Sequence, residues 1–225
     1  AELEAVPVSK ARDVGFDRSM IGSYGHDDRV CAYTALMATA DCKDPRYTSV
    51  LVLTDKEETG SDGNTGLCSS YLQYFIADLA AAFGQEARTV LSHSRCLSAD
   101  VNAAFDPTFP DVLDPRNAAF LNYGVVVTKF TGARGKSGTS DASAEFVATI
   151  RNLMDENQII WQTGELGKVD MGGGGTVALY IANMDVDTID VGVPVMSMHA
   201  PMEVVAKIDV YMAYKAFLAF ISDKT

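Results

Sequence analysis

The sequence predicts an α/β fold: a mostly parallel sheet with helices on both of its faces. Short apolar, β-branched segments alternate with longer stretches of helical periodicity between residues 29 and 222, and this alternation is typical of strands joined through helices. The chain has 225 residues, 48% of them hydrophobic, so it can bury one sizeable core. It contains no internal repeat, low-complexity tract or linker, and we therefore expect one domain over residues 1–225.

The first half of the chain predicts two helices and two strands. A helix is expected at about residues 29–38, and residues 67–83 have the pattern of a second, amphipathic helix that the following glycine ends. Residues 48–55 are the clearest strand, because they are short, apolar and β-branched. A further strand is expected at about residues 88–91. Residues 1–25 show little periodicity and predict no strand–helix unit.

The second half begins with a loop that contains three prolines and then alternates again between strands and helices. Strands are expected at residues 124–130, 159–163 and 188–191, and helices up to about residue 157 and at residues 176–184 and 203–222. Ser140 or Asp141 can cap the first of these helices. Residues 131–140 are rich in Gly, Ser and Thr and predict a flexible loop.

Charge and composition exclude several classes of partner. The formal net charge of −12 argues against nucleic acid and against anionic membranes, since either would need a basic patch. No stretch approaches the roughly 20 apolar residues that cross a bilayer, and residues 1–4 lack the features of a signal peptide, so we expect a cytoplasmic protein. The four cysteines have no Cys-x-x-Cys spacing, which favours reduced thiols over a zinc knuckle.

Acidic residues stand where the predicted strands end or a helix begins. Glu57 and Glu58 follow the predicted strand at residues 48–55, Asp27 precedes the first helix, and Asp100 follows the second strand. His199 precedes the last helix. Carboxylates and imidazole are hard-to-borderline metal ligands, and the carboxyl ends of strands are where open α/β sheets bind ligands. The sequence therefore predicts a two-metal site.

Two-metal hydrolysis divides these residues by role. One carboxylate bridges two divalent ions, others complete each shell, and one acid stays free as a general base. One of Glu57 and Glu58 can serve as a metal ligand and the other as the general base, because neighbouring residues that leave a strand point in different directions. The alternative for any single acid is that it caps a helix or lies in a solvated turn.

Other polar features have simpler interpretations beside functional ones. His26 adjoins Asp27 and is either a partner of the site or a surface residue, and His93 is interpreted as structural. The glycine run at residues 172–175 lacks the Gly-Lys-Ser/Thr ending of a phosphate loop. It predicts either close backbone approach to a ligand or a tight turn.

Four ordered segments that contain the acids and the histidine resemble the aspartyl aminopeptidase / aminopeptidase I family of dinuclear zinc exopeptidases. The segments are Gly25-His26-Asp27-Asp28-Arg29-Val30-Cys31-Ala32, Asp55-Lys56-Glu57-Glu58-Thr59-Gly60-Ser61-Asp62-Gly63, Ser98-Ala99-Asp100-Val101-Asn102-Ala103 and Met198-His199-Ala200-Pro201-Met202-Glu203. The similarity spans nearly the whole chain, including residues 162–168 and the glycine run.

The resemblance implies a role for each residue. Asp27 would bridge two zinc ions, and Glu57 would be the general base. Glu58 and His199 would complete the shell of one ion, and Asp100 would bind the other. Asp28 is carried over only as a neighbour of the bridge. The resemblance also implies that cobalt or manganese can substitute for zinc, as in the family.

The resemblance also implies a zinc-exopeptidase-like (phosphorylase/hydrolase-like) three-layer domain that is incomplete at its N-terminus. Family members bring one more metal-binding His from an upstream His-x-Asp motif, and no His precedes His26 here. The chain therefore resembles the carboxy-terminal catalytic portion.

The implied activity is removal of the N-terminal residue from peptides, in a large homo-oligomer. Arg134, Lys136 and Lys168 are cations that could recognise an acidic N-terminal residue, or they are ordinary surface charges. The alternative function is a truncated, non-catalytic metal-binding subunit with an assembly or regulatory role.

Overall fold

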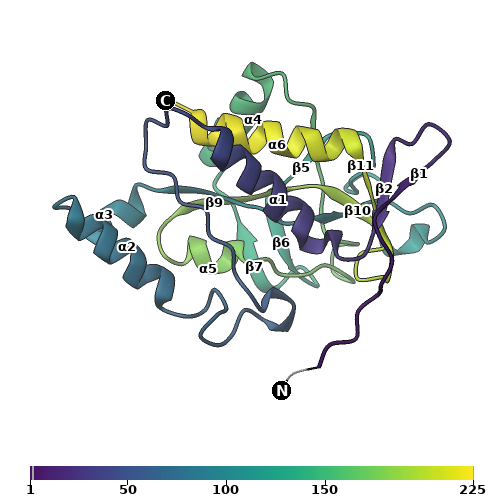
Figure 1. Cartoon of the computed structure of the whole chain (residues 1–225), viewed down its shortest axis with the longest axis horizontal. Helices are drawn as coiled ribbons and strands as arrows, with labels where there is room; N and C mark the ends of the chain where they lie inside the picture. The colour runs from purple at the N-terminus through teal and green to yellow at the C-terminus, as the bar shows by residue number, and fades with distance from the viewer. Residues whose placement is uncertain (2, 225) are drawn as a thin grey trace.

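A four-stranded mixed sheet forms the centre of the fold. The computed structural model describes residue 1 and residues 3–224, and within these residues the sheet has the strand order β3-β9-β5-β8 (Figure 1). Its strands are β3 Arg95–Ser98, β9 Asp187–Gly192, β5 Val125–Thr128 and β8 Trp161–Thr163. The pairs β3–β9 and β5–β8 are parallel, and β5–β9 is antiparallel. All side chains of β5 are buried, as expected for a strand covered on both faces.

Helices cover both faces of this sheet, which confirms the predicted α/β class. On one face lie α1 His26–Asp41, α4 Ala144–Glu156 and α6 Lys207–Ser222, with α1 and α6 side by side (Figure 1). The other face carries α5 Ala178–Ala182 and the hairpin of β6 Phe130–Ala133 and β7 Ser137–Asp141. To one side, α2 Tyr71–Ala82 and α3 Ala87–Ser92 pack against each other.

Helix α4 illustrates why the predicted helices form. Phe146, Ile150, Leu153 and Met154 recur at helical spacing and are all buried, so one face of the helix packs into the core. The side chain of Ser143 accepts a hydrogen bond from the backbone N–H of Phe146 and caps the helix. The cap is therefore Ser143 and not Ser140 or Asp141, which lie in β7.

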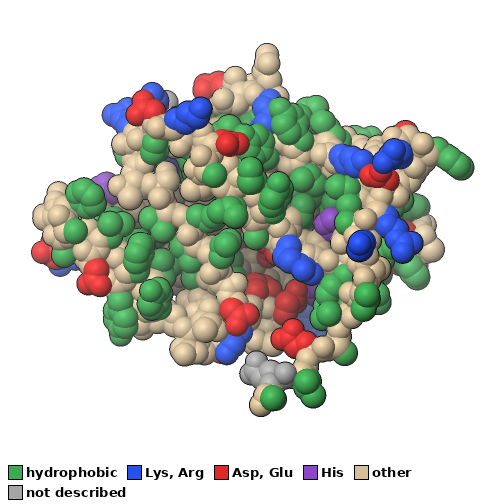
Figure 2. Space-filling view, in the orientation of Figure 1, with side chains coloured by type: hydrophobic (Ala, Val, Ile, Leu, Met, Phe, Trp, Pro, Cys, Tyr) green, Lys and Arg blue, Asp and Glu red, His purple; other side chains and the backbone are tan. Residues whose placement is uncertain are grey.

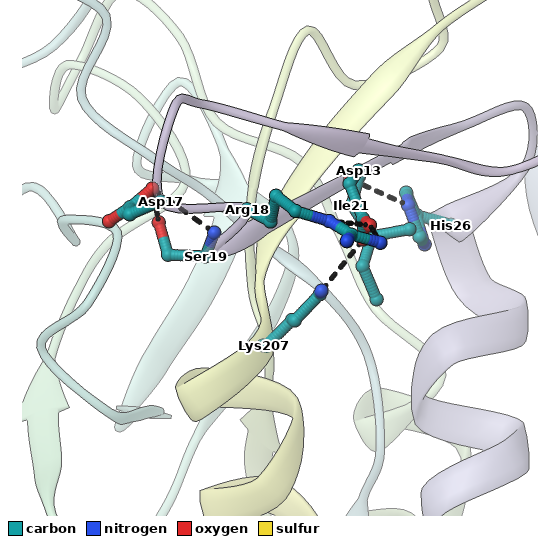
Figure 3. Close-up of polar contacts among 7 residues, drawn as sticks. All are labelled: Asp13, Asp17, Arg18, Ser19, Ile21, His26 and Lys207. Atoms are coloured by element: carbon teal, nitrogen blue, oxygen red, sulfur yellow. Dashed lines mark hydrogen bonds and ion pairs between the residues drawn. The ribbon is translucent and has the colours of Figure 1, made fainter.

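A five-stranded sheet joins the two ends of the chain. Its strand order is β1 Arg12–Val14, β2 Met20–Ser23, β11 Glu203–Ala206, β10 Pro194–Met196 and β4 Asn102–Ala103, as far as the described residues go. All its pairings are antiparallel except β10 with β4. Asp13 accepts a hydrogen bond from Lys207 Nζ at 2.7 Å and pairs with Arg18, so the β1–β2 hairpin also contacts the start of α6 (Figure 3).

The prediction of a strand at residues 48–55 is wrong. The segment has no regular secondary structure, and none of the described strands pairs with it. Val50, Val52 and Leu53 are 41, 42 and 61% exposed. Their β-branched, apolar pattern favours an extended backbone, but a strand also needs a partner for its N–H and C=O groups. The segment instead lines a cavity opposite β3.

Other predicted boundaries differ from the structure because strand pairing is decided by distant residues. Residues 88–91 lie in helix α3, and the strand β3 follows them. Residues 131–140, predicted as a flexible loop, form most of the β6–β7 hairpin. Residues 203–206 are strand β11, so the last helix begins only at Lys207. Short apolar runs do not distinguish helix from strand by periodicity alone.

Two further predictions concern cysteines and membranes. Cys31, Cys42, Cys68 and Cys96 are all free thiols, as predicted. Burial raises the pKa of Cys96 to about 12, so this thiol stays protonated at neutral pH. Within the described part of the chain, no helix combines the length and the apolar character needed to cross a membrane.

Asp209 connects α6 to the turn that leads into β5. The residue is fully buried, and its carboxylate accepts the backbone N–H of Asn122 at 2.7 Å and of Gly124 at 2.8 Å. Gly124 has φ +90, and a Cβ there would lie 2.0 Å from the carbonyl oxygen of Ile160, so the turn requires glycine. Burial raises the pKa of Asp209 to about 6 in spite of these bonds.

We predict that Asp209→Ala destabilises the protein. Two buried N–H groups lose their acceptor, which lowers the free energy of unfolding by about 2–6 kcal/mol at roughly 1–3 kcal/mol for each unpaired donor. Urea unfolding followed by circular dichroism measures the change. Asp78→Asn, on the exposed surface of α2, is the control. A loss below about 0.5 kcal/mol, the range of ordinary surface substitutions, would contradict the assigned role of Asp209.

Candidate metal centre

The acids and the histidine singled out from the sequence come together at one place. Asp27 is the second residue of α1, Glu57 and Glu58 lie in the short helix Glu57–Thr59, and Asp100 follows β3. His199 lies in the loop between β10 and β11. The five side chains therefore converge from segments far apart in the sequence.

Asp27, Glu58 and His199 form the first group of side chains that could hold an ion. His199 Nε2 lies 2.9 Å from Oδ2 of Asp27 and 3.0 Å from Oε1 of Glu58. The side chain of Asp27 is only 9% exposed, whereas those of Glu58 and His199 are 57 and 60% exposed. One imidazole and two carboxylates, with one side open to solvent, are a donor set that suits a catalytic zinc ion.

Asp27, Asp28 and Asp100 form the second group, with one carboxylate oxygen of each within 4.8 Å of the others. The Asp27–Asp28 peptide bond is cis. Oδ1 of Asp28 is buried and has no hydrogen-bond partner among the described residues. Buried polar atoms are nearly always paired, so an unpaired oxygen on a carboxylate that belongs to this group fits a cation as its partner.

Burial and mutual repulsion raise the pKa of these carboxyls. The pKa of Asp27 is raised to about 6, mainly by burial and secondly by the nearby charge of Glu58. Burial raises the pKa of Asp28 and Asp100 well above the usual range, and neighbouring acids add to the effect. A divalent cation would offset both the cost of burying these carboxylates and their mutual repulsion, so the residues present fit a metal ion.

Glu57 belongs to neither group of potential ligands among the described residues. The side chain of Glu57 is partly buried. Its pKa is raised mainly by this burial and secondly by the charge of Glu58. It lines the same two cavities as Asp27, Glu58 and Asp100. Glu57 is thus adjacent to both groups, with a carboxyl that is easier to protonate than a solvated glutamate.

The acids lie where two cavities meet. One cavity, of about 440 Å³, extends between β3 and residues 49–54, and the other, of about 700 Å³, extends toward the glycine run. Figure 2 shows acidic side chains gathered in a hollow below the centre of this face of the molecule. Phe109, Val112, Leu113 and Leu166 are among the apolar side chains that line the larger cavity. A ligand in that cavity would contact apolar walls on one side and carboxylates on the other.

The glycine run contributes backbone to the larger cavity. Gly173, Gly174 and Gly175 line it, and a Cβ on Gly173 would lie 2.3 Å from the carbonyl oxygen of Gly132. The glycine run therefore approaches the backbone of the β6–β7 hairpin closely, and its approach to a ligand stays a prediction.

Several residues considered from the sequence lie outside the centre. Nε2 of His26 lies 3.2 Å from the carbonyl oxygen of Ile21 (Figure 3), and the exposed His93 contacts the carbonyl of Thr89 through Nδ1. Arg134, Lys136 and Lys168 line neither cavity.

Sequence reasoning missed two residues of the centre. Asp28 was treated only as a neighbour of Asp27, yet its carboxylate lies in the second group. Glu203 received no role, although it accepts hydrogen bonds from the backbone of both Asp27 and His199. Their presence inside the quoted motifs was the available signal, but their orientation depends on how β2, β10 and β11 pair.

Two curated proteins are similar to this chain over nearly its whole length. "Probable M18 family aminopeptidase 1" of Clostridium acetobutylicum is 46% identical over 227 residues, covering 99% of this chain and 49% of that protein, and the Thermotoga maritima relative of the same name is 44% identical over 221 residues. The chain spans about half the length of the curated relatives it matches.

Solved structures and a family model match as well. The crystal structure of aminopeptidase I from Clostridium acetobutylicum has a TM-score of 0.91 at 46% identity, covering 97% of this chain and 48% of that one. The M18 aminopeptidase of Thermotoga maritima has a TM-score of 0.93 at 43% identity, covering 97% and 50%. The model of the aminopeptidase I zinc metalloprotease family matches residues 1–221. The chain therefore belongs to the aminopeptidase I zinc metalloprotease family, M18.

Proposed function

We propose that this chain carries the two-metal site of a metallo-aminopeptidase, which hydrolyses the N-terminal residue from peptides. One observation supports the proposal above all: two groups of potential ligands share Asp27, and Glu57 lies beside both without belonging to either. A shared carboxylate, separate ligand sets and a free acid are the parts that two-metal hydrolysis requires. Residues 1–225 are proposed to be the catalytic-domain portion of such an enzyme.

The ligand roles follow from the two groups. Asp27 would bridge two ions, Glu58 and His199 would complete the shell of one, and Asp100 would bind the other with Asp28 beside it. The proposed ions are zinc, with cobalt or manganese as substitutes. When bound, two such ions lower the pKa of a shared water and polarise the scissile carbonyl group.

Glu57 is proposed as the general base. Its carboxylate accepts the proton of the attacking water and delivers it to the amine of the departing peptide. Burial and the neighbouring charge of Glu58 raise the pKa of Glu57, and a higher pKa makes the carboxylate a stronger proton acceptor. A ligand could not do this, because its lone pairs would be engaged by the metal.

The larger cavity is proposed to hold the N-terminal part of the peptide. Phe109, Leu113 and Leu166 among its lining residues suit a neutral side chain, and the three cations considered from the sequence are absent from its lining. Homo-oligomeric assembly and a cytoplasmic location remain part of the proposal, and one similar yeast structure is described as a dodecamer. Membership of an enzyme family argues against a purely non-catalytic subunit.

We predict that Glu57→Gln keeps its metal but loses hydrolysis. The amide cannot accept a proton, so turnover should fall by roughly 10²–10⁴-fold, the usual contribution of a general base. Metal content by mass spectrometry and release of an aminoacyl dye measure the two effects, with the exposed Glu156→Gln as control. Loss of metal in Glu57→Gln would mean that Glu57 and Glu58 have exchanged roles.

We predict that Asp27→Asn weakens the binding of both metal ions. One bridging carboxylate serves two cations, and a neutral amide is a poor substitute for its charge. Calorimetric titration with zinc should show both binding steps weakened relative to the exposed Asp78→Asn control. If only one step changed, the bridge would have to be another acid, of which Asp28 is the nearest choice.

We predict that zinc binds this chain in two unequal steps. The group with His199 offers the mixed nitrogen and oxygen ligands that zinc prefers, whereas the other group offers only carboxylates, which suit harder ions. His199→Ala should remove the tighter step, and His93→Ala, at an exposed histidine outside the centre, should remove neither. Equal affinities for both steps would contradict this assignment.

A further inference from the structure

Glu203 is a buried acid that joins the two halves of the centre. It is 2% exposed, and its carboxylate accepts two backbone N–H groups: that of Asp27 at Oε2, at 3.0 Å, and that of His199 at Oε1, at 2.8 Å. Asp27 and His199 come from opposite ends of the chain. One side chain therefore contacts the backbone of two of the three residues in the first group of potential ligands.

Strand pairing explains how Glu203 reaches both residues. It is the first residue of β11, and it lies opposite Ser23, the last residue of β2. The chain continues from Ser23 to Asp27, and β11 also pairs with β10, from which the loop to His199 departs. Glu203 thus lies at the point where both ligand-bearing segments leave the sheet.

The two segments need hydrogen bonds that hold them in place, because neither has a regular backbone conformation at its potential metal ligand, Asp27 or His199. His199 has φ +65 and Ser197 has φ +59, a left-handed conformation that costs a non-glycine residue of order 1–3 kcal/mol unless its surroundings hold it. Asp27 has ψ 110 at the start of α1, which is not helical. A hydrogen bond from an N–H group to a carboxylate is stronger than one between neutral groups, and Glu203 makes one to each.

Glu203 does not fit the role of a metal ligand. It belongs to neither group of potential ligands among the described residues, and each of its oxygens already accepts an N–H bond. We propose that Glu203 is a positioning residue, which holds Asp27 and His199 at the spacing at which they bind one zinc ion. This inference rests on the metal site of the proposed function and adds the residue that sets its geometry.

Two substitutions separate the geometry of Glu203 from its charge. Glu203→Gln keeps the size but turns an NH2 group toward one of the two N–H donors, and Glu203→Asp keeps the charge but shortens the reach. Both should weaken zinc binding at the tighter step by about 10–100-fold, the usual effect of losing a residue that orients a ligand. Competition with a zinc chelator measures the affinity, and the absorption bands of bound cobalt report the changed geometry.

Asp209→Asn is the matched control. Asp209 is also fully buried and also accepts two backbone N–H groups, but it lies at α6 and lines neither cavity. It should lower the free energy of unfolding while zinc affinity and the cobalt spectrum stay as in the unmodified protein. A comparable loss of zinc affinity in Asp209→Asn would mean that destabilisation alone explains the effect, which overturns the proposal.

The remaining outcomes distinguish this inference from the proposed function. Wild-type zinc affinity in Glu203→Gln or Glu203→Asp, with affinity lost in Asp27→Asn and His199→Ala, overturns the role of Glu203 alone. Unchanged zinc affinity in Asp27→Asn and His199→Ala overturns the metal site itself. If neither Glu203 variant folds, amide hydrogen exchange in the unmodified, metal-free protein decides: slow exchange at Asp27 and His199 supports the proposal, and fast exchange overturns it.

Discussion

The crowding of carboxylates is the constraint on which the rest of this structure depends. One carboxylate oxygen from each of Asp27, Asp28 and Asp100 lies within 4.8 Å of the others, and burial makes each negative charge costly. Like charges so close lower stability unless a cation lies between them or protons neutralise them. A fold that keeps them together against this repulsion must hold each segment firmly, and the scaffold around the centre does so.

The two larger sheets divide this task. The four-stranded sheet carries Asp100 at the end of β3, and its buried strands give that end a rigid position. The five-stranded sheet brings β2 and β11 together, and Asp27 and His199 lie in the segments next to these two strands. Glu203 connects these last two through their backbones. The centre therefore lies at a junction between sheets, where residues far apart in the chain can meet.

The open side of the centre has a different physical character. Residues 49–54 lie opposite β3 across a cavity, and several of their apolar side chains are exposed. Glu57 and Glu58 follow this segment and lie in a single short helical turn. The acids contributed by this side are thus held by local turn geometry and less by strand pairing, which leaves Glu58 more exposed than Asp27.

The sequence by itself predicted the longer helices and the acids and histidine that come together at the candidate metal centre. Amphipathic spacing, as in Phe146, Ile150 and Leu153, is a local signal, and so is an acid or histidine inside a short motif. Only the tertiary structure decided which apolar segments are strands: residues 48–55 found no partner, whereas residues 203–206 pair with two strands. It also decided that Asp28 and Glu203 face the centre. The physical reason is that strand pairing and side-chain orientation at a junction depend on contacts between residues far apart in the chain, which no local pattern encodes.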